Sequence, residues 1–244
     1  MTPEECAART TAAVSGLASF FMLDGATYAA GAEQGFSGLD FYAAGRAGVL
    51  GAVPAEQVTS CFGFMEPGTV RGWWEQAAGV MPPEQASDAF MACAYDWADE
   101  HLGDGVDWAR AAELVGKVVA GAPDDGLPLF GAWRKAPEPT DRSDKALALH
   151  RFHVLRELRN EIHVAAVADA GLQPAEAVLV KSPAMAPLFG WTADGPEVGD
   201  DHRQRHDQAE AETNRRIAPA YAALDDAERD ELVQLCDAAL AAVR

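Results

Sequence analysis

One segment of the chain carries four polar side chains whose types could bind a small molecule and act on it chemically. His153, Arg156, Asn160 and His163 lie in HRFHVLRELRNEIHVAAVADAG, residues 150–171. At about 100° per residue they share one side of a helix, within roughly 80°. An arginine can hold an anion, and a histidine can transfer a proton. We therefore expect Arg156 and His163 to be the catalytic candidates, with His153 and Asn160 binding the ligand.

The other sides of the same helix are apolar, which predicts that the helix is buried. Buried polar groups need partners, because an unpaired charge in the interior costs several kcal/mol. Two interpretations follow. In one, Arg156 pairs with an acid from another helix, Asn160 caps a neighbouring chain end, and the histidines are ordinary core residues. In the other, the four residues form the polar floor of a mostly apolar cavity.

A second group of candidates is aromatic and precedes this helix by about a hundred residues in the sequence. Tyr42, Phe62 and Phe64 could wall a planar apolar ligand, and Arg46, one helical turn after Tyr42, could hold its charged end. Packing in the hydrophobic core explains most of these aromatic residues equally well. If they form a wall, the cavity should lie between them and the face that bears His153 and His163.

The histidine spacing does not predict a metal site. His153 and His163 are about 15 Å apart along a helix axis, too far to share one ion. His202 and His206, at i and i+4, could chelate an ion, but a pair in such a charged run is usually exposed and incidental. We expect no metal, and the cofactor is unknown: a haem or a flavin could fit an aromatic cavity, but no feature requires one. The wide spacing of the four cysteines argues against disulfides and against zinc.

Helical signals dominate the elements that must position these residues. Alanine is abundant, and glycine or proline recurs where helices would end. The chain should be all-α, a multi-helix bundle, with a linker at residues 137–141 between two helical subdomains, 1–136 and 137–244. The second contains the long helix 143–170. The expected helices span 3–23, 27–34, 38–50, 54–64, 67–79, 83–102, 107–120, 128–135, 143–170, 174–181, 201–223 and 225–243.

Charge argues against nucleic acid as a partner. The chain has 38 acidic and 19 basic residues, a formal net charge of −19. Such a charge repels phosphate and removes the term that dominates nucleic-acid affinity. The richest basic stretch, residues 200–216, alternates its arginines with acids. We expect a solvated helix face there, with the bases largely neutralised.

The N-terminus predicts neither a signal peptide nor a membrane anchor. No basic region precedes its apolar run, and no apolar stretch approaches the roughly 20 residues that span a bilayer. We therefore expect a cytoplasmic protein with no membrane partner. Aromatic residues such as Trp73 and Trp74 could form a homodimer interface or belong to the core.

Two stretches together resemble a known family. DFYAAGRAGVLGAVPAEQVTSCFGFMEPGTV (40–70) and LHRFHVLRELRNEIHVAAVADAGLQPAEAVLV (149–180) resemble the SalK-like family of high-GC bacteria, which is described as a helix-turn-helix family. The stretch between Trp191 and Thr213 is short and acidic, so the winged-helix portion should be reduced or absent. The matching positions are Tyr42, Arg46, Gly51, Phe62, Phe64, Pro67, Leu155, Arg156, Glu157, Arg159, His163 and Glu176.

These features predict a small-molecule-binding helical protein, which could be an enzyme of specialised metabolism. The alternative is a transcriptional regulator or a protein-interaction module of helix-turn-helix descent, in which the polar stripe is a buried network. The chain contains no phosphate-binding loop, zinc-protease motif, nucleophile elbow or dinucleotide-binding fingerprint. The sequence therefore leaves open whether the protein breaks bonds.

Overall fold

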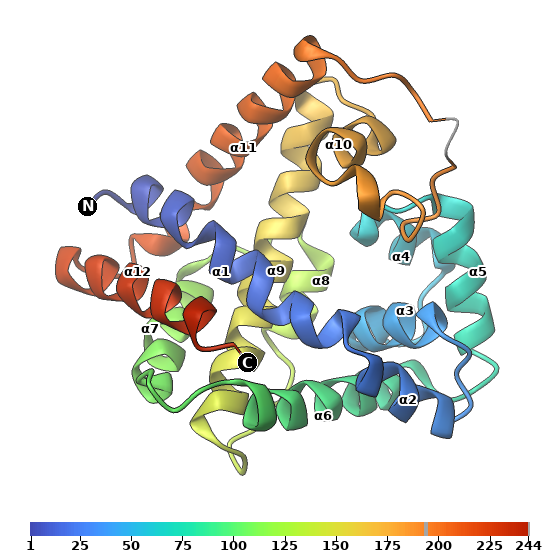
Figure 1. Ribbon diagram of the computed structural model, residues 1–244, viewed down its shortest axis with the longest axis horizontal. Helices are drawn as coiled ribbons and strands as arrows, with labels where there is room; N and C mark the ends of the chain where they lie inside the picture. The colour runs from blue at the N-terminus through green and yellow to red at the C-terminus, as the bar shows by residue number, and fades with distance from the viewer. Residues whose placement is uncertain (193–194, 244) are drawn as a thin grey trace.

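A computed structural model describes residues 1–192 and 195–243, and this part of the chain is all-α, as predicted (Figure 1). The described residues contain no strand beyond an isolated bridge between Leu102 and Val243. The α-helices are α1 (Pro3–Leu23), α2 (Gly25–Glu33), α3 (Leu39–Ala47), α4 (Ala55–Phe62), α5 (Pro67–Ala77), α6 (Pro83–His101), α7 (Trp108–Gly121), α8 (Pro128–Trp133), α9 (Asp144–Asp169), α10 (Pro174–Lys181), α11 (Asp200–Tyr221) and α12 (Asp226–Ala241). Two short 3-10 helices span Gly48–Leu50 and Pro183–Met185.

Local signals explain where the helices begin. Thr2 caps α1 by accepting a hydrogen bond from the backbone N–H of Glu5, whose carboxylate accepts from the N–H of Thr2. Ser143 caps α9 in the same way through the N–H of Ala146. Proline stands in the first turn of α1, α5, α6, α8 and α10, where its missing N–H costs nothing.

Helix α9 runs through the centre of the molecule and packs against α1, α6, α7, α8 and α11 (Figure 1). The main hydrophobic core extends from Cys6 in α1 to Ala239 in α12, so it draws on both sides of residues 137–141. The division into subdomains 1–136 and 137–244 stays a prediction. Arg244, at the end of the second, and residues 193–194, within the stretch where a reduced winged-helix portion was expected, lie outside the described residues.

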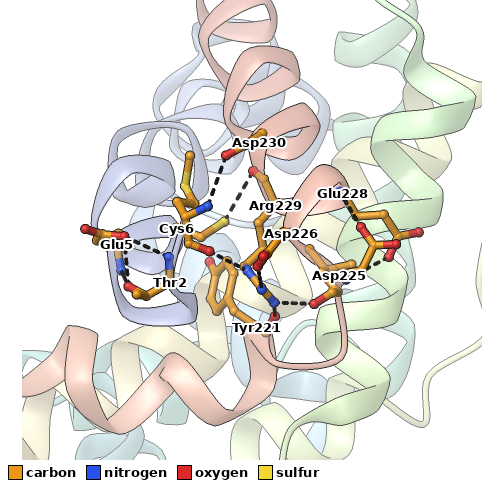
Figure 2. A network of polar contacts seen from close by, with 11 residues as sticks. Thr2, Glu5, Cys6, Tyr221, Asp225, Asp226, Glu228, Arg229 and Asp230 are labelled. Carbon is orange, nitrogen blue, oxygen red and sulfur yellow. Dashed lines mark hydrogen bonds and ion pairs between the residues drawn. The ribbon is translucent and has the colours of Figure 1, made fainter.

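Arg229 of α12 joins the two ends of the chain (Figure 2). Its Nε donates to the carbonyl of Met1 at 2.9 Å, and its Nη1 donates to the carbonyls of Tyr221 and Leu224. Asp226 forms an ion pair with the same guanidinium. The start of α1 is thereby held against the corner between α11 and α12, and α1 and α11 contribute two walls of the cavity described below.

Helix α1 corrects one expectation from the sequence. By length and composition it is apolar enough to cross a membrane, with a mean hydropathy of 1.3, whereas no such stretch was expected. Half of its apolar window is buried, and α1 packs against α9, α11 and α12. A core helix of a folded protein meets the same criterion, because burial in protein selects apolar residues as lipid does.

We expect Gly48→Ala to lower the free energy of unfolding by about 1–3 kcal/mol, the usual effect of overpacking. A Cβ atom at Gly48 would lie 1.9 Å from the carbonyl oxygen of Pro83, where the turn after α3 meets α6. Gly72→Ala in α5 is the control. A Cβ atom there meets nothing within 4 Å, so the higher helix propensity of alanine should raise the free energy of unfolding by about 0.5–1 kcal/mol. Urea denaturation measures both, and equal stability of the two variants would contradict the close approach.

Candidate functional site

A cavity of about 570 Å³ opens between α1, α9, α10 and α11, and we call it the α9 cavity. Its volume lies in the range of small-ligand sites. Small and aromatic side chains supply apolar walls, among them Ala8 and Ala12 from α1, Ala177 from α10, and Phe64 and Phe189 from the connecting segments. Polar side chains of α9 and α11 supply the rest of the lining.

The polar stripe predicted on α9 divides into two parts. Arg156, Asn160 and His163 line the α9 cavity. His153 does not: it is fully buried, and its ring stands edge-on to Trp133 with the ring centroids 4.5 Å apart. Neither ring nitrogen of His153 has a hydrogen-bond partner among the described residues, and burial lowers the pKa of His153 to about 3. His153 is thus a neutral core residue that packs against Trp133 of α8 and Phe21 of α1.

Asn160 combines a structural contact with a place in the cavity lining. Its Nδ2 donates to the carbonyl oxygen of Cys61 at 3.1 Å, near the end of α4. This contact agrees with the first interpretation of the polar stripe, in which Asn160 caps a neighbouring chain end. Since Cys61 is followed by Phe62 and Phe64, the bond also fixes the aromatic segment against α9.

The aromatic cluster encloses a buried ion pair. Arg46 donates from Nε and Nη2 to the two oxygens of Glu157 at 2.9 and 2.7 Å, and the two side chains are only 2% and 0% exposed. The Arg46 Nη1 donates to the hydroxyl of Tyr42 at 3.1 Å, and the guanidinium lies 4.5 Å from the centroid of the Phe62 ring. Arg46 is therefore held in this ion pair and Phe62 packs against its guanidinium; neither lines the α9 cavity, whereas Phe64 does.

The charge on Glu157 is kept in spite of its burial. Burial raises the pKa of this carboxyl, but Arg46 and Arg156 outweigh burial and lower the pKa to about 2. For Arg46, burial disfavours the charged form, and Glu157 more than compensates, so the pKa of Arg46 rises above its usual value. The pair is therefore ionised throughout the physiological range.

Arg156 shares the carboxylate that Arg46 already neutralises. Its Nη1 donates to Oε1 of Glu157 at 2.6 Å. Two guanidinium groups thus surround one carboxylate, which leaves one positive charge in excess. Arg156 is 18% exposed and lines both the α9 cavity and a smaller cavity of about 80 Å³, which Tyr42 also lines. The excess charge is consequently available to the contents of the α9 cavity.

A second polar cluster connects α9 to α11 along the cavity. Arg159 donates to Oε2 of Glu210 at 2.6 Å and to Oδ1 of Asn214 at 2.9 Å. His163 forms a hydrogen bond through Nδ1 with the hydroxyl of Thr213 at 2.8 Å. All of these partners come from one helix, α11, so the register between α9 and α11 determines the whole cluster.

Burial determines the protonation of the histidines in this cluster. It lowers the pKa of His163 to about 4 and that of His206 below its ordinary value. Burial would raise the pKa of Glu210, but His163 and Arg159 outweigh burial and lower it. At neutral pH the cluster therefore holds two neutral imidazoles and an ionised carboxylate.

His206 and Glu210 were not among the expected site residues. The i, i+4 spacing suggested His202 as the partner of His206, but His202 turns to α10, where its Nε2 lies 3.6 Å from Glu176. The ring of His206 instead stands edge-on to His163, with centroids 5.9 Å apart. The i, i+4 spacing of His206 and Glu210 was a usable signal, but only the packing of α11 on α9 shows what that face meets.

The basic residues of α11 are neutralised locally, as expected. None of its four arginines lines the α9 cavity, and each forms an ion pair with a nearby acid. The pairs are Arg203–Asp200, Arg205–Asp201, Arg215–Glu212 and Arg216–Asp169. Such exposed pairs add little stability, but they reduce the positive potential of this helix face.

Comparison with known families gives one result that spans the chain. A model described as a helix-turn-helix family matches residues 7–244, which include every residue of the α9 cavity. Comparisons with curated proteins and with solved structures gave no match.

Proposed function

The chain belongs to this helix-turn-helix family, and on that premise we propose that it is a small-molecule-binding member whose α9 cavity holds an organic anion. The charge of the cavity lining carries this proposal. Four basic residues, Arg9, Arg156, Arg159 and Lys181, line the cavity together with a single acid, Glu210. Over the whole chain acids outnumber bases by 38 to 19, so the lining reverses the overall balance.

Arg156 is the residue we propose for holding the anion. Glu157 occupies only its Nη1, which leaves Nε and Nη2 without a partner among the described residues and able to donate to a carboxylate or phosphate. The negative charge of Glu210 does not stand against an anionic ligand, because Arg159 already neutralises it in an ion pair. The apolar walls around Phe64 and Phe189 favour a ligand with a hydrocarbon or aromatic body.

We expect Arg156→Gln to weaken the binding of benzoate or octanoate about 10–100-fold, the loss of one charge-assisted hydrogen-bonded contact. The variant should fold, because Arg46 and Glu157 still neutralise each other in their buried ion pair. Arg71→Gln is the matched control: it removes one positive charge from an exposed pair with Glu56 outside the cavity. Isothermal titration calorimetry gives the affinities, and benzamide serves as the uncharged analogue of benzoate.

Equal affinity for benzoate and benzamide would contradict the proposal, as would an Arg156→Gln variant that binds like Arg71→Gln. Native mass spectrometry of the protein as purified supplies a second test. A retained molecule with an acidic group supports the proposal. A ligand-free mass, together with no binding of benzoate or octanoate, overturns it.

We also propose that, within the family, the chain is of the SalK-like type. The residues that carry that resemblance contact one another across the fold: Tyr42 and Phe62 surround Arg46, which pairs with Glu157. A resemblance in scattered segments gains weight when the matching positions form one contact network, because substitutions in contacting residues are energetically coupled.

The description of the family favours one alternative, a transcriptional regulator of helix-turn-helix descent. Such proteins insert a recognition helix into the major groove and bind phosphates with free bases. The paired arginines of α11 and the net charge of −19 disfavour that function. A fluorescence anisotropy titration with a short DNA duplex at low salt separates the two: saturable binding that weakens steeply with salt would support the regulator.

A further inference from the structure

Three side chains of the types that ligate metal ions meet where α9 and α11 line the cavity. A ring nitrogen of His163, a ring nitrogen of His206 and a carboxylate oxygen of Glu210 all lie within 4.8 Å of one another. His206 and Glu210 are one turn apart on α11, and His163 reaches them from α9. All three also line the α9 cavity, so an incoming ion or ligand can reach them.

A chain of hydrogen bonds sets the tautomer of His163. The hydroxyl of Thr213 donates its single proton to the carbonyl of Ala209 at 2.7 Å. It must therefore accept from Nδ1–H of His163, 2.8 Å away. Nε2 of His163 consequently carries a lone pair, and it lies 3.8 Å from Oε1 of Glu210. Histidine ligands are commonly oriented by such a bond from the opposite ring nitrogen.

The carboxylate of Glu210 is oriented in a similar way. Arg159 donates to Oε2 at 2.6 Å and is itself held by Asn214, which leaves Oε1 directed to the histidines. Lys181 also approaches Oε1, at 3.8 Å, but its side chain is 65% exposed and long. It can turn into solvent at little cost, because an exposed pair of this kind contributes about 0–1 kcal/mol.

The protonation states suit ligation better than acid–base catalysis. A histidine whose pKa is about 4, as for His163, is a weak base at neutral pH, but its lone pair remains available to a metal ion. Burial also lowers the pKa of His206, so its ring is neutral as well, and it lines the α9 cavity beside His163.

We propose that His163, His206 and Glu210 bind one divalent transition-metal ion at the wall of the α9 cavity. Two imidazoles and one carboxylate are a donor set suited to Zn²⁺ or Fe²⁺. Metal–ligand bonds of about 2.0–2.2 Å bring donor atoms to roughly 3.0–3.4 Å from one another. Small side-chain rotations that shorten the present separations are enough to reach that geometry.

Such a site goes beyond the binding of an organic anion. Three protein ligands would leave at least one coordination position free, and the three side chains line the same cavity as Arg156. An anionic group in the cavity could then contact both the ion and the guanidinium. The metal site does not depend on that ligand, since its donors and their supporting bonds all belong to the protein.

Calorimetric titration with Zn²⁺ alone tests the site, on protein prepared without a histidine tag and stripped with a chelator. We expect one ion per chain. His206→Ala and Glu210→Gln should each weaken Zn²⁺ binding by about 100-fold or more, since losing even a supporting bond costs about 10–100-fold. His202→Ala is the matched control, one turn earlier on α11, and should bind like the wild type.

Absence of one-to-one Zn²⁺ binding would overturn the site, and so would an equal loss in His202→Ala, which would assign the ion to the surface pair His202 and His206. Circular dichroism of each variant separates lost ligation from lost fold, and Glu210→Gln preserves the shape of the side chain in case His206→Ala does not fold. Benzoate titrations in the presence of a chelator examine the anion proposal separately. Either proposal can therefore fail while the other stands.

Discussion

Glu157→Gln is expected to lower the free energy of unfolding by about 3–5 kcal/mol, the typical result of breaking a buried ion pair from one side. The substitution keeps the shape of the side chain but removes its charge. Arg46, 2% exposed, would then remain buried beside Arg156 with no carboxylate between them. Since a domain has only about 5–15 kcal/mol in total, the variant should be close to unfolding at 37 °C. Urea denaturation at pH 7 measures the loss.

Two further variants test the physical reason for that loss. Glu56→Gln removes a carboxylate from an exposed pair with Arg71 and should cost less than about 1 kcal/mol. The double variant Arg46→Met, Glu157→Met replaces both charges by apolar groups and should be more stable than Glu157→Gln alone, because it removes the fully buried charge of Arg46 and leaves only the partly exposed Arg156 without its carboxylate. If Glu157→Gln lowered the free energy of unfolding no more than Glu56→Gln does, water would have to reach the Arg46–Glu157 pair in solution.

The second large effect expected is a steep loss of stability in mild acid. Burial lowers the pKa of His153 to about 3 and that of His150 to about 4, whereas both are near 6.5 in the unfolded chain. Between about pH 6.5 and 4 the unfolded state therefore binds more protons than the folded state. The stability is fully present above pH 6.5 and falls as the pH decreases, by about 2–3 kcal/mol per pH unit for the two residues together.

Urea denaturation at a series of pH values measures this slope, with a chelator present to keep the α9 cavity free of metal. His153→Leu should reduce the slope by about 1.4 kcal/mol per pH unit, because the unfolded state of the variant binds one proton fewer. Leucine suits the site, since His153 has no hydrogen-bond partner to lose among the described residues. An unchanged slope in His153→Leu would mean that protonation of other groups, not of this buried histidine, drives acid unfolding.

The helices were predictable because their signals are local. Proline and capping residues such as Ser143 act on backbone groups within one turn, and the long helix expected over residues 143–170 is α9, Asp144–Asp169. The expected helix 38–50 is shorter in the structure: α3 ends at Ala47 and a 3-10 turn follows. The packing of Gly48 against Pro83 accompanies that change, and it is a tertiary contact that no local pattern contains.

The candidate site was predictable only in part, and the polar stripe on α9 illustrates why. Helical spacing places His153, Arg156 and His163 on one face, and they do share it. Whether that face meets core or cavity depends on its neighbours. Phe21 of α1 and Trp133 of α8 pack against His153, whereas Arg156 and His163 line the α9 cavity. The same spacing reasoning offered Arg46 as a ligand-binding residue, and the structure shows its guanidinium held by Glu157.

The all-α class, most helix boundaries and the sharing of a helix face all follow from local sequence, because each depends on groups no more than about four residues apart. Which charges are paired, and which face the cavity, depends instead on the packing of the helices. The partner of Arg46 is 111 residues away, and the hydroxyl that orients His163 is 50 residues away. Contacts over such separations follow from how the helices pack against one another, and no spacing along a single helix encodes them.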